Sequence, residues 1–244
     1  METGHAKNVA NFGKIKTFVT GYGAAYAPAN PKLVIAAITP KFTASDLAVK
    51  AVEPVHKPYK DAIDLRKTSF APVNAILTSA FKVLKSSDGV SDTTVNDAFT
   101  LLKKIKGTNR PPKKKTGGSE PTPDSHSTSQ QSYDMRLANI VDFIALLAAT
   151  PQYTPNEVEI KVANLQAGAA DLAVVNTAVA TAYQPYSTAL KNRDTELYAP
   201  ETGLYDIAAK IKTYVSGITT LSATDKKLVT SLKFTKPLDK ALHL

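Results

Sequence analysis

The feature that most constrains the fold of this chain is an order of residues that recurs in its two halves. Pro58, Tyr59 and Arg66 are matched 127 residues later by Pro185, Tyr186 and Arg193. The other matches are Tyr26-x-Pro28 with Tyr153-x-Pro155, Ala10-Asn11 with Ala138-Asn139, and Asp46–Val49 with Asp171–Val174, at offsets of 127, 128 and 125. Ordered matches whose offsets drift so little indicate a tandem duplication.

A polar segment separates the two copies. It contains the adjacent prolines Pro111 and Pro112, a glycine pair and almost no apolar residue. Such a composition neither continues a helix nor fills a core. We therefore expect a first helical repeat over residues 1–106, a basic Pro/Gly/Ser-rich linker over 107–132 and a second helical repeat over 133–244.

Composition and periodicity favour helices. Hydrophobic residues make up 43% of the chain, but aromatic residues only 7%, and tryptophan is absent. Apolar residues along 165–197 recur at spacings of three, four and seven, as on one face of a helix. In the second repeat we place helical stretches near 134–149, 156–183, 185–216 and 223–233. The first repeat is expected to follow the same plan with a more broken second helix.

A length estimate predicts the shape. If residues 156–197 form one kinked helix, it spans about 60 Å at the usual rise per residue. A compact globule of this chain length would be only about 45 Å across. We therefore predict an all-α protein, an elongated antiparallel helical bundle made of two tandem repeats of a roughly four-helix unit.

No pattern in the sequence assembles a catalytic site. The absence of cysteine excludes thiolate catalysis and cysteine-ligated zinc or iron–sulfur clusters. None of the four histidines has a second ligand at metal-binding spacing. The run Gly21-Tyr22-Gly23 is better explained by the end of a helix than by a phosphate-binding loop. We expect no catalytic, cofactor-binding or metal-binding residue, and no cofactor.

The residues that define the repeat are interpreted as structural. Pro58 and Pro185 fall at equivalent places inside the periodic run, so a kink or break there belongs to the repeated unit. Arg66 and Arg193 each follow the repeated tyrosine by seven residues. They either form ion pairs with neighbours such as Asp64 and Asp194 or with carboxylates on a facing helix, or they extend from the edge of the bundle. Ligand binding by these arginines is the less favoured alternative.

Basic charge is concentrated in one segment. Residues 101–132 carry seven basic and two acidic side chains, which supply +5 of the net charge of +9. The side chains available to nucleic acid or another anion are Lys103, Lys104, Lys106, Arg110, Lys113, Lys114 and Lys115. Seven phosphate contacts would give a log–log salt slope of about −6. No aromatic residue is interleaved to stack on bases, so a solvated linker is the favoured interpretation.

The opening METGHAKNVANF, residues Met1–Phe12, resembles the start of a family of bacterial proteins of similar length with no assigned activity. The likeness continues at Ser129-Gln130-x-Ser132-x-Asp134-x-Arg136, at Tyr153-x-Pro155-Asn156-Glu157 and at Leu232-Lys233-Phe234. The resemblance implies a bacterial cytoplasmic protein. Gly13 departs from the acidic residue expected there, and the linker is more basic and richer in proline than in the family.

These observations predict a structural or interaction protein with no catalytic activity. Duplicated helical units without a convergent polar site are suited to self-assembly or to docking a protein partner. The expected partner is therefore another copy of the chain or another protein. The alternative is a nucleic-acid-associated accessory protein that binds through the basic linker. No stretch approaches the length of a membrane span, so we expect a cytoplasmic protein without membrane insertion.

Overall fold

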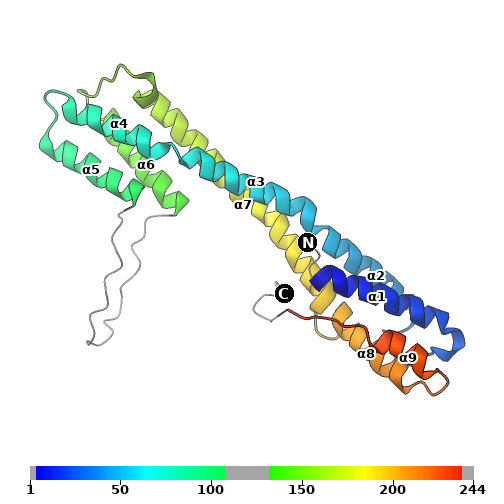
Figure 1. The fold of residues 1–244 in the computed structure, drawn as a ribbon. Coiled ribbons are helices and arrows are strands. Elements are labelled where there is room, and N and C mark those ends of the chain that lie inside the picture. Colours follow the sequence, from blue (N-terminus) through cyan, green and yellow to red (C-terminus); the bar gives the residue numbers. More distant parts are fainter. Residues whose placement is uncertain (1–3, 108–131, 238–244) are drawn as a thin grey trace, which may run out of the picture. The chain divides into compact units, whose positions relative to one another are not determined.

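The computed structural model describes residues 4–107 and 132–237. Within these ranges the chain forms α-helices and two short 3₁₀ turns, and no strand, which confirms the all-α prediction. The elements are α1 (Gly4–Gly21), η1 (Gly23–Ala25), α2 (Ile35–Lys50), α3 (Val52–Phe70), α4 (Val73–Ser86), α5 (Asp92–Lys106), α6 (Tyr133–Ala148), η2 (Val158–Ile160), α7 (Val162–Tyr198), α8 (Leu204–Gly217) and α9 (Ala223–Thr230). Figure 1 labels the α-helices of the described residues.

The helices form two compact units. Unit 1 combines Met1–Lys60 with Ala182–Leu244, and unit 2 is the continuous stretch Asp61–Thr181. The boundary between the units falls inside both α3 and α7. A compact unit is defined by contacts and a repeat by sequence similarity, so the predicted repeats over 1–106 and 133–244 remain a prediction.

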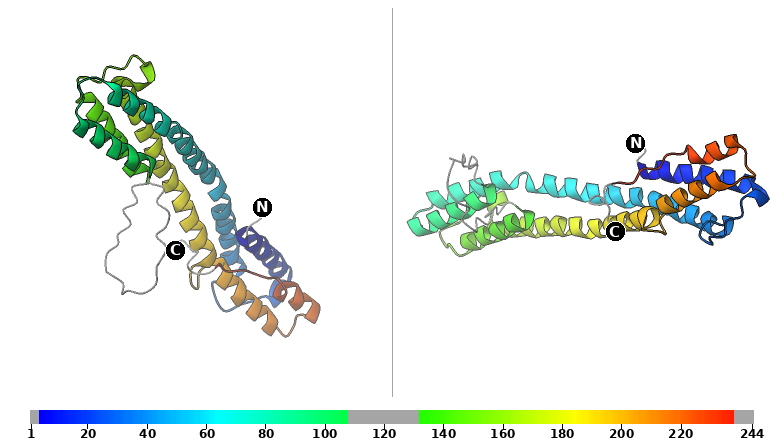
Figure 2. Two further views of the ribbon diagram at one scale, coloured as in Figure 1. Left: turned by 60° about the vertical axis from the view of Figure 1, so that its left-hand side comes forward. Right: turned by 90° about the horizontal axis from the view of Figure 1, so that it is seen from below.

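Unit 1 is built around α1. This helix packs against α2, α8 and α9, and α8 also packs against α2, so segments from both ends of the chain share one core (Figures 1 and 2). Phe12 and Ile15 of α1 are fully buried with Leu204 and Ile211 of α8. After α9 the chain continues without regular structure along α1, where the Asn11 amide donates to the Lys233 carbonyl at 2.8 Å.

Unit 2 has a separate core formed by α4, α5, α6 and the first part of α7. The helix α5 packs closely on α6 and on α4. Phe143 and Leu147 of α6 are buried with Leu84 of α4 and Ile105 of α5. Burying a side chain of this size contributes roughly 1.5–3 kcal/mol, so these contacts dominate the stability of the unit.

The predicted division into helical stretches at 156–183 and 185–216 is wrong, whereas the single helix through Pro185 that the length estimate assumed is present. The helix α7 continues through this proline to Tyr198, and a separate α8 follows, so the stretch predicted over 185–216 is two helices. A proline removes one hydrogen bond without forbidding a helix when packing stabilises both sides. The chain instead turns where Glu201 adopts a φ of 61°. Pro58 also lies within a helix, α3, and the first repeat breaks earlier, at Ala51.

The start predicted at residue 156 is also wrong, because a 3₁₀ turn and a buried tyrosine occupy this segment. The Tyr153 hydroxyl donates to the Ile160 carbonyl at 2.8 Å, and α7 begins only at Val162. The first half contains the same arrangement, in which the Tyr26 hydroxyl donates to the Leu33 carbonyl at 2.7 Å. Burial raises the pKa of each tyrosine to about 12.

One of the sequence matches does not join equivalent positions. The 125-residue offset pairs Leu47 with Leu172, but Leu47 is 61% exposed and Leu172 is 7% exposed. An offset of 127 instead pairs Ile38 with Leu165, and both are buried. The same offset relates the first residues of α2 and α7, Ile35 and Val162. The burial pattern and the first residues of α2 and α7 therefore agree with an offset of 127 and not with 125.

Candidate functional site

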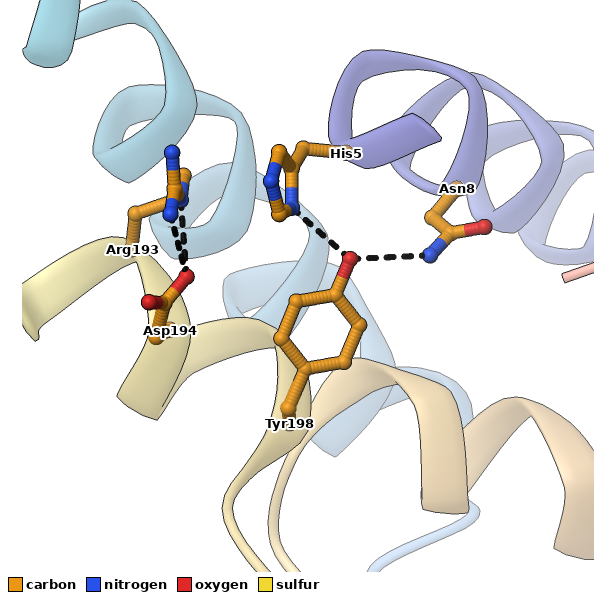
Figure 3. Close-up of polar contacts among 5 residues, drawn as sticks. All are labelled: His5, Asn8, Arg193, Asp194 and Tyr198. Carbon is orange, nitrogen blue, oxygen red and sulfur yellow. Dashed lines mark hydrogen bonds and ion pairs between the residues drawn. The ribbon is translucent and has the colours of Figure 1, made fainter. Parts of the chain in front are cut away.

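The most connected polar group in unit 1 lies around the hydroxyl of Tyr198, the last residue of α7 (Figure 3). Tyr198 is 2% exposed. Its hydroxyl lies 2.8 Å from Nδ1 of His5 and accepts a hydrogen bond from the Asn8 amide at 3.2 Å. The Asn8 side chain also joins both backbone groups of Thr235, donating to the carbonyl at 2.7 Å and accepting from the N–H at 3.0 Å. The network therefore ties α1, α7 and the segment after α9 together.

An ion pair lies beside this network on α7. The Arg193 guanidinium contacts one carboxylate oxygen of Asp194 through two nitrogens, at 2.8 Å from Nε and 2.6 Å from a terminal nitrogen (Figure 3). The Asp194 side chain is fully buried, and that of Arg193 is 13% exposed. A buried carboxylate is tolerated only when it is paired and hydrogen-bonded. This contact gives Arg193 a structural task within unit 1.

The electrostatics of the network favour its neutral form. Burial, followed by the nearby Arg193 charge, lowers the pKa of His5, and Asp194 offsets part of this effect. Burial raises the pKa of Tyr198, and the Asn8 hydrogen bond opposes the rise. At neutral pH the tyrosine therefore keeps its proton, and the lowered pKa of His5 favours an uncharged imidazole beside it. A buried hydroxyl held in this way is suited to fixing the geometry of the helices.

The lowered pKa of His5 predicts a pH dependence of stability. Because the folded-state pKa lies below the unfolded value of 6.5, the unfolded chain binds the proton more readily as the pH falls. We expect the melting temperature to decrease between pH 7.5 and 5.5, and the His5→Gln variant to lose part of this decrease. Thermal unfolding followed by circular dichroism measures the effect. The His56→Gln variant, whose Tyr198 network is intact, should keep the full slope.

The repeat-defining tyrosines meet in unit 1. The rings of Tyr59 and Tyr186 are stacked, with centroids 5.3 Å apart and an interplanar angle of 19°. His56 lies 5.1 Å from Tyr186, and Tyr183 lies 5.2 Å from Tyr59. His56 and Tyr183 are themselves 127 residues apart. Under this offset the contact of His56 with Tyr186 therefore corresponds to the contact of Tyr183 with Tyr59. Tyr183 is 48% exposed, so part of the cluster faces solvent.

The other repeat-defining arginine, Arg66, lies in unit 2 and has different partners from Arg193. Its guanidinium donates to the Asn176 side chain at 3.1 Å and lies 4.1 Å from the ring centroid of Tyr133. Pro58 and Pro185 lie within helices one residue before the stacked tyrosines. The structure thus brings together the rings of Tyr59 and Tyr186, whereas Arg66 belongs to unit 2 and Arg193 to unit 1.

The predicted basic group is described only in part. Lys103, Lys104 and Lys106 are exposed on the last turn of α5, and the Lys103 ammonium lies 4.1 Å from the ring centroid of Phe99. Lysines at this end of a helix interact favourably with its dipole. Arg110, Lys113, Lys114 and Lys115 lie outside the described residues.

Sequence reasoning missed a cavity of about 330 Å³ in unit 2. Its walls are largely apolar and come from α4, α6 and α7, including Val73, Leu77, Ile140, Leu165 and Leu172. Its polar lining residues are Ser69, Glu159, Asn164 and Asp171, and Gly168 contributes no side chain.

Gly168 is an unexpected residue in this wall because it lies in the interior of α7. Glycine destabilises a helix interior by about 1 kcal/mol relative to alanine. A Cβ atom added at Gly168 would have no heavy atom within 4 Å, so close packing within the chain does not require glycine there. An alignment of the two halves at the offset of 127 could have revealed this site, because it pairs Gly168 with Lys41 in the sequence.

Among the described residues, no group of three or more histidine and carboxylate side chains is arranged to hold a metal ion. None of the described helices combines the length and the apolar composition required to cross a bilayer. No protein-family model matches the chain, and neither the curated proteins nor the solved structures include a significantly similar chain.

Proposed function

We propose that this chain is a cytoplasmic helical interaction protein without catalytic activity, and that it associates with copies of itself. The observation that carries the proposal is the aromatic cluster of His56, Tyr59, Tyr183 and Tyr186, in which a large ring is half exposed beside a stacked pair. Tyrosines of this kind are enriched at the centres of protein interfaces because they bury a large area and lose little conformational entropy. The cluster therefore supports an interface function.

The choice of a second copy as partner rests on the symmetry of the cluster. Its contacts are reciprocal under the offset of 127, because His56 lies on Tyr186 as Tyr183 lies on Tyr59. A surface that is nearly unchanged when its two halves are exchanged is well suited to pairing with an identical surface about a twofold axis. Pairing of this kind would join the chains through one patch on each copy.

The proposed architecture is a tandem duplication, in which two copies of an elongated antiparallel unit supply these matched side chains. The Tyr26 and Tyr153 hydrogen bonds, each to a carbonyl seven residues ahead, support the duplication. The burial of both Ile38 and Leu165, which are 127 residues apart, also supports the duplication.

Self-association is tested by replacing the most exposed ring of the cluster. We expect the Tyr183→Ser variant to dimerise about 10-fold more weakly than the native chain, as for the loss of one interface anchor. Sedimentation equilibrium across a range of protein concentrations measures the dissociation constant.

The matched control is Val158→Ser, which removes an apolar side chain that is 64% exposed on unit 2. This variant should dimerise as the native chain does. A native chain that stays monomeric at millimolar concentration would contradict self-association. Equal weakening by both substitutions would contradict the assignment to the aromatic cluster.

Binding of nucleic acid through the basic linker remains the alternative. The three lysines on α5 have a sufficient explanation in the helix dipole. Gel-shift titration of single-stranded DNA at low salt tests this alternative, with Lys113, Lys114 and Lys115 replaced by glutamine as the comparison.

A further inference from the structure

The cavity of unit 2 occupies a place that is filled in unit 1. Under the offset of 127, Gly168 corresponds to Lys41 and Ser69 corresponds to Glu196. In unit 1 the Lys41 ammonium and the Glu196 carboxylate form an ion pair at 2.7 Å, and their side chains are only 18% and 34% exposed. In unit 2 both positions line the cavity, and neither has a long side chain.

A third position changes without a net loss of volume. Phe42 corresponds to Ala169, which also lines the cavity. In unit 1 the Phe42 ring lies so close to Gly13 that a Cβ atom there would come within 2.9 Å of Cε2. At the offset of 127, Gly13 corresponds to Ile140, which also lines the cavity, so the small residue at 169 is offset by a large one at 140. The net loss of volume around this space therefore comes from glycine at 168 and serine at 69.

The charge of the cavity wall indicates the chemistry of what it holds. Glu159 and Asp171 are the charged residues among its lining, and both are acidic and solvent-exposed. The remaining wall is mostly hydrocarbon, as in ligand pockets of this size. In unit 1 the corresponding space takes up the Lys41 side chain, which is an aliphatic chain that ends in an ammonium group. A ligand of the same chemistry matches both the apolar wall and the acidic mouth of unit 2.

We propose that the cavity lined by Gly168, Ser69, Glu159 and Asp171 in unit 2 binds an aliphatic amine. Its hydrocarbon chain lies between α4, α6 and α7, and its ammonium group faces the two carboxylates. The absence of a side chain at residue 168 leaves the room that this chain occupies. The inference uses the proposed duplication for its register. It does not depend on self-association, because a monomeric chain that binds the amine would still support it.

The test is isothermal titration of the full chain with octylamine at pH 7, below its micellar concentration. We expect saturable binding of octylamine and at least about 10-fold weaker binding of 1-octanol and of octanoate. Titration with Nα-acetyl-lysine methylamide distinguishes the source of the ammonium group. Tighter binding of that probe would identify a protein lysine as the natural ligand, and tighter binding of octylamine would identify a free amine.

Two variants link the binding to this cavity. Ser69→Glu combined with Gly168→Lys transfers the ion pair of unit 1 into unit 2, and it should weaken octylamine binding at least about 10-fold. Glu159→Gln combined with Asp171→Asn should weaken the amine similarly while leaving 1-octanol unchanged. Gly217→Ala, at the end of α8, is the control and should bind as the native chain does.

Thermal unfolding without ligand shows whether the filled variant is folded. Its melting temperature should equal or exceed that of the native chain, because glycine is removed from the interior of a helix. Equal octylamine affinity in the native and filled chains would overturn the proposal. Equal affinity of the native chain for the amine, the alcohol and the carboxylate would also overturn it.

Discussion

Replacing Arg193 by alanine is expected to lower the free energy of unfolding by about 3–5 kcal/mol. The substitution removes the guanidinium that contacts Asp194 at 2.6 Å and leaves the fully buried carboxylate without this partner. For a chain of this length such a loss corresponds to a melting temperature lower by roughly 10 °C. Urea unfolding and differential scanning calorimetry measure the two quantities.

Arg66→Ala is the matched control for this prediction. Arg66 is the counterpart of Arg193, but its partners are the neutral Asn176 and Tyr133. Its removal does not strip a buried carboxylate of its counter-charge, so we expect a loss of only about 1–2 kcal/mol. Equal losses for the two variants would show that the burial of Asp194 does not determine the cost.

A second large effect is expected at Gly203, the residue before α8. A Cβ atom there would lie 2.7 Å from both the nitrogen and the oxygen of Ala199 and 2.8 Å from the oxygen of Leu197. All three are backbone atoms, so rotating a side chain cannot relieve the clash. We expect Gly203→Ala to destabilise unit 1 by roughly 2–4 kcal/mol through displacement of the turn between α7 and α8. The same unfolding measurements apply.

The other end of α8 provides the control for Gly203. An added Cβ atom at Gly217 meets no atom within 4 Å. Gly217→Ala should therefore be neutral or stabilising by up to about 1 kcal/mol. A Gly203→Ala variant as stable as Gly217→Ala would mean that the turn accommodates a side chain without strain.

The helices with local signals were predicted well from the sequence. A stretch near 134–149 was expected and α6 spans Tyr133–Ala148, and Ser222 caps α9 by accepting from the Asp225 N–H at 3.1 Å. The Gly21-Tyr22-Gly23 run ends α1 as expected, and Gly23 has a φ of 53°. Caps and glycines act within one turn of a helix, so their effect can be read locally.

Features that depend on distant partners were not predictable in the same way. A proline usually ends a helix, but α7 continues through Pro185 because packing stabilises the helix on both sides of it. That packing involves residues that are distant in the sequence. The hydrogen bond between the side chains of His5 and Tyr198 joins residues 193 positions apart. No local pattern encodes this pairing.

The cavity of unit 2 was easier to predict from the sequence than these long-range contacts. Its signal is the replacement of Lys41 by Gly168 and of Glu196 by Ser69 across the two halves. Finding it requires the offset of 127, and the chance match of Asp46–Val49 with Asp171–Val174 indicated 125 instead. An error of two residues in the alignment corresponds to a rotation of about 200° around the helix axis. It therefore pairs a buried position with an exposed one. The exposure of Leu47 resolves the register.

The division into units has a consequence for how the protein is made. Unit 2 is one uninterrupted stretch, whereas the core of unit 1 joins α1 to α8 and α9. At roughly 5–20 residues per second, α1 leaves the ribosome on the order of ten seconds or more before α8 is synthesised. During that interval Phe12 and Ile15 can pack against α2 but lack α8 and α9, which complete their core, so they are accessible to chaperones. Complete burial of α1 therefore waits for helices that are synthesised much later.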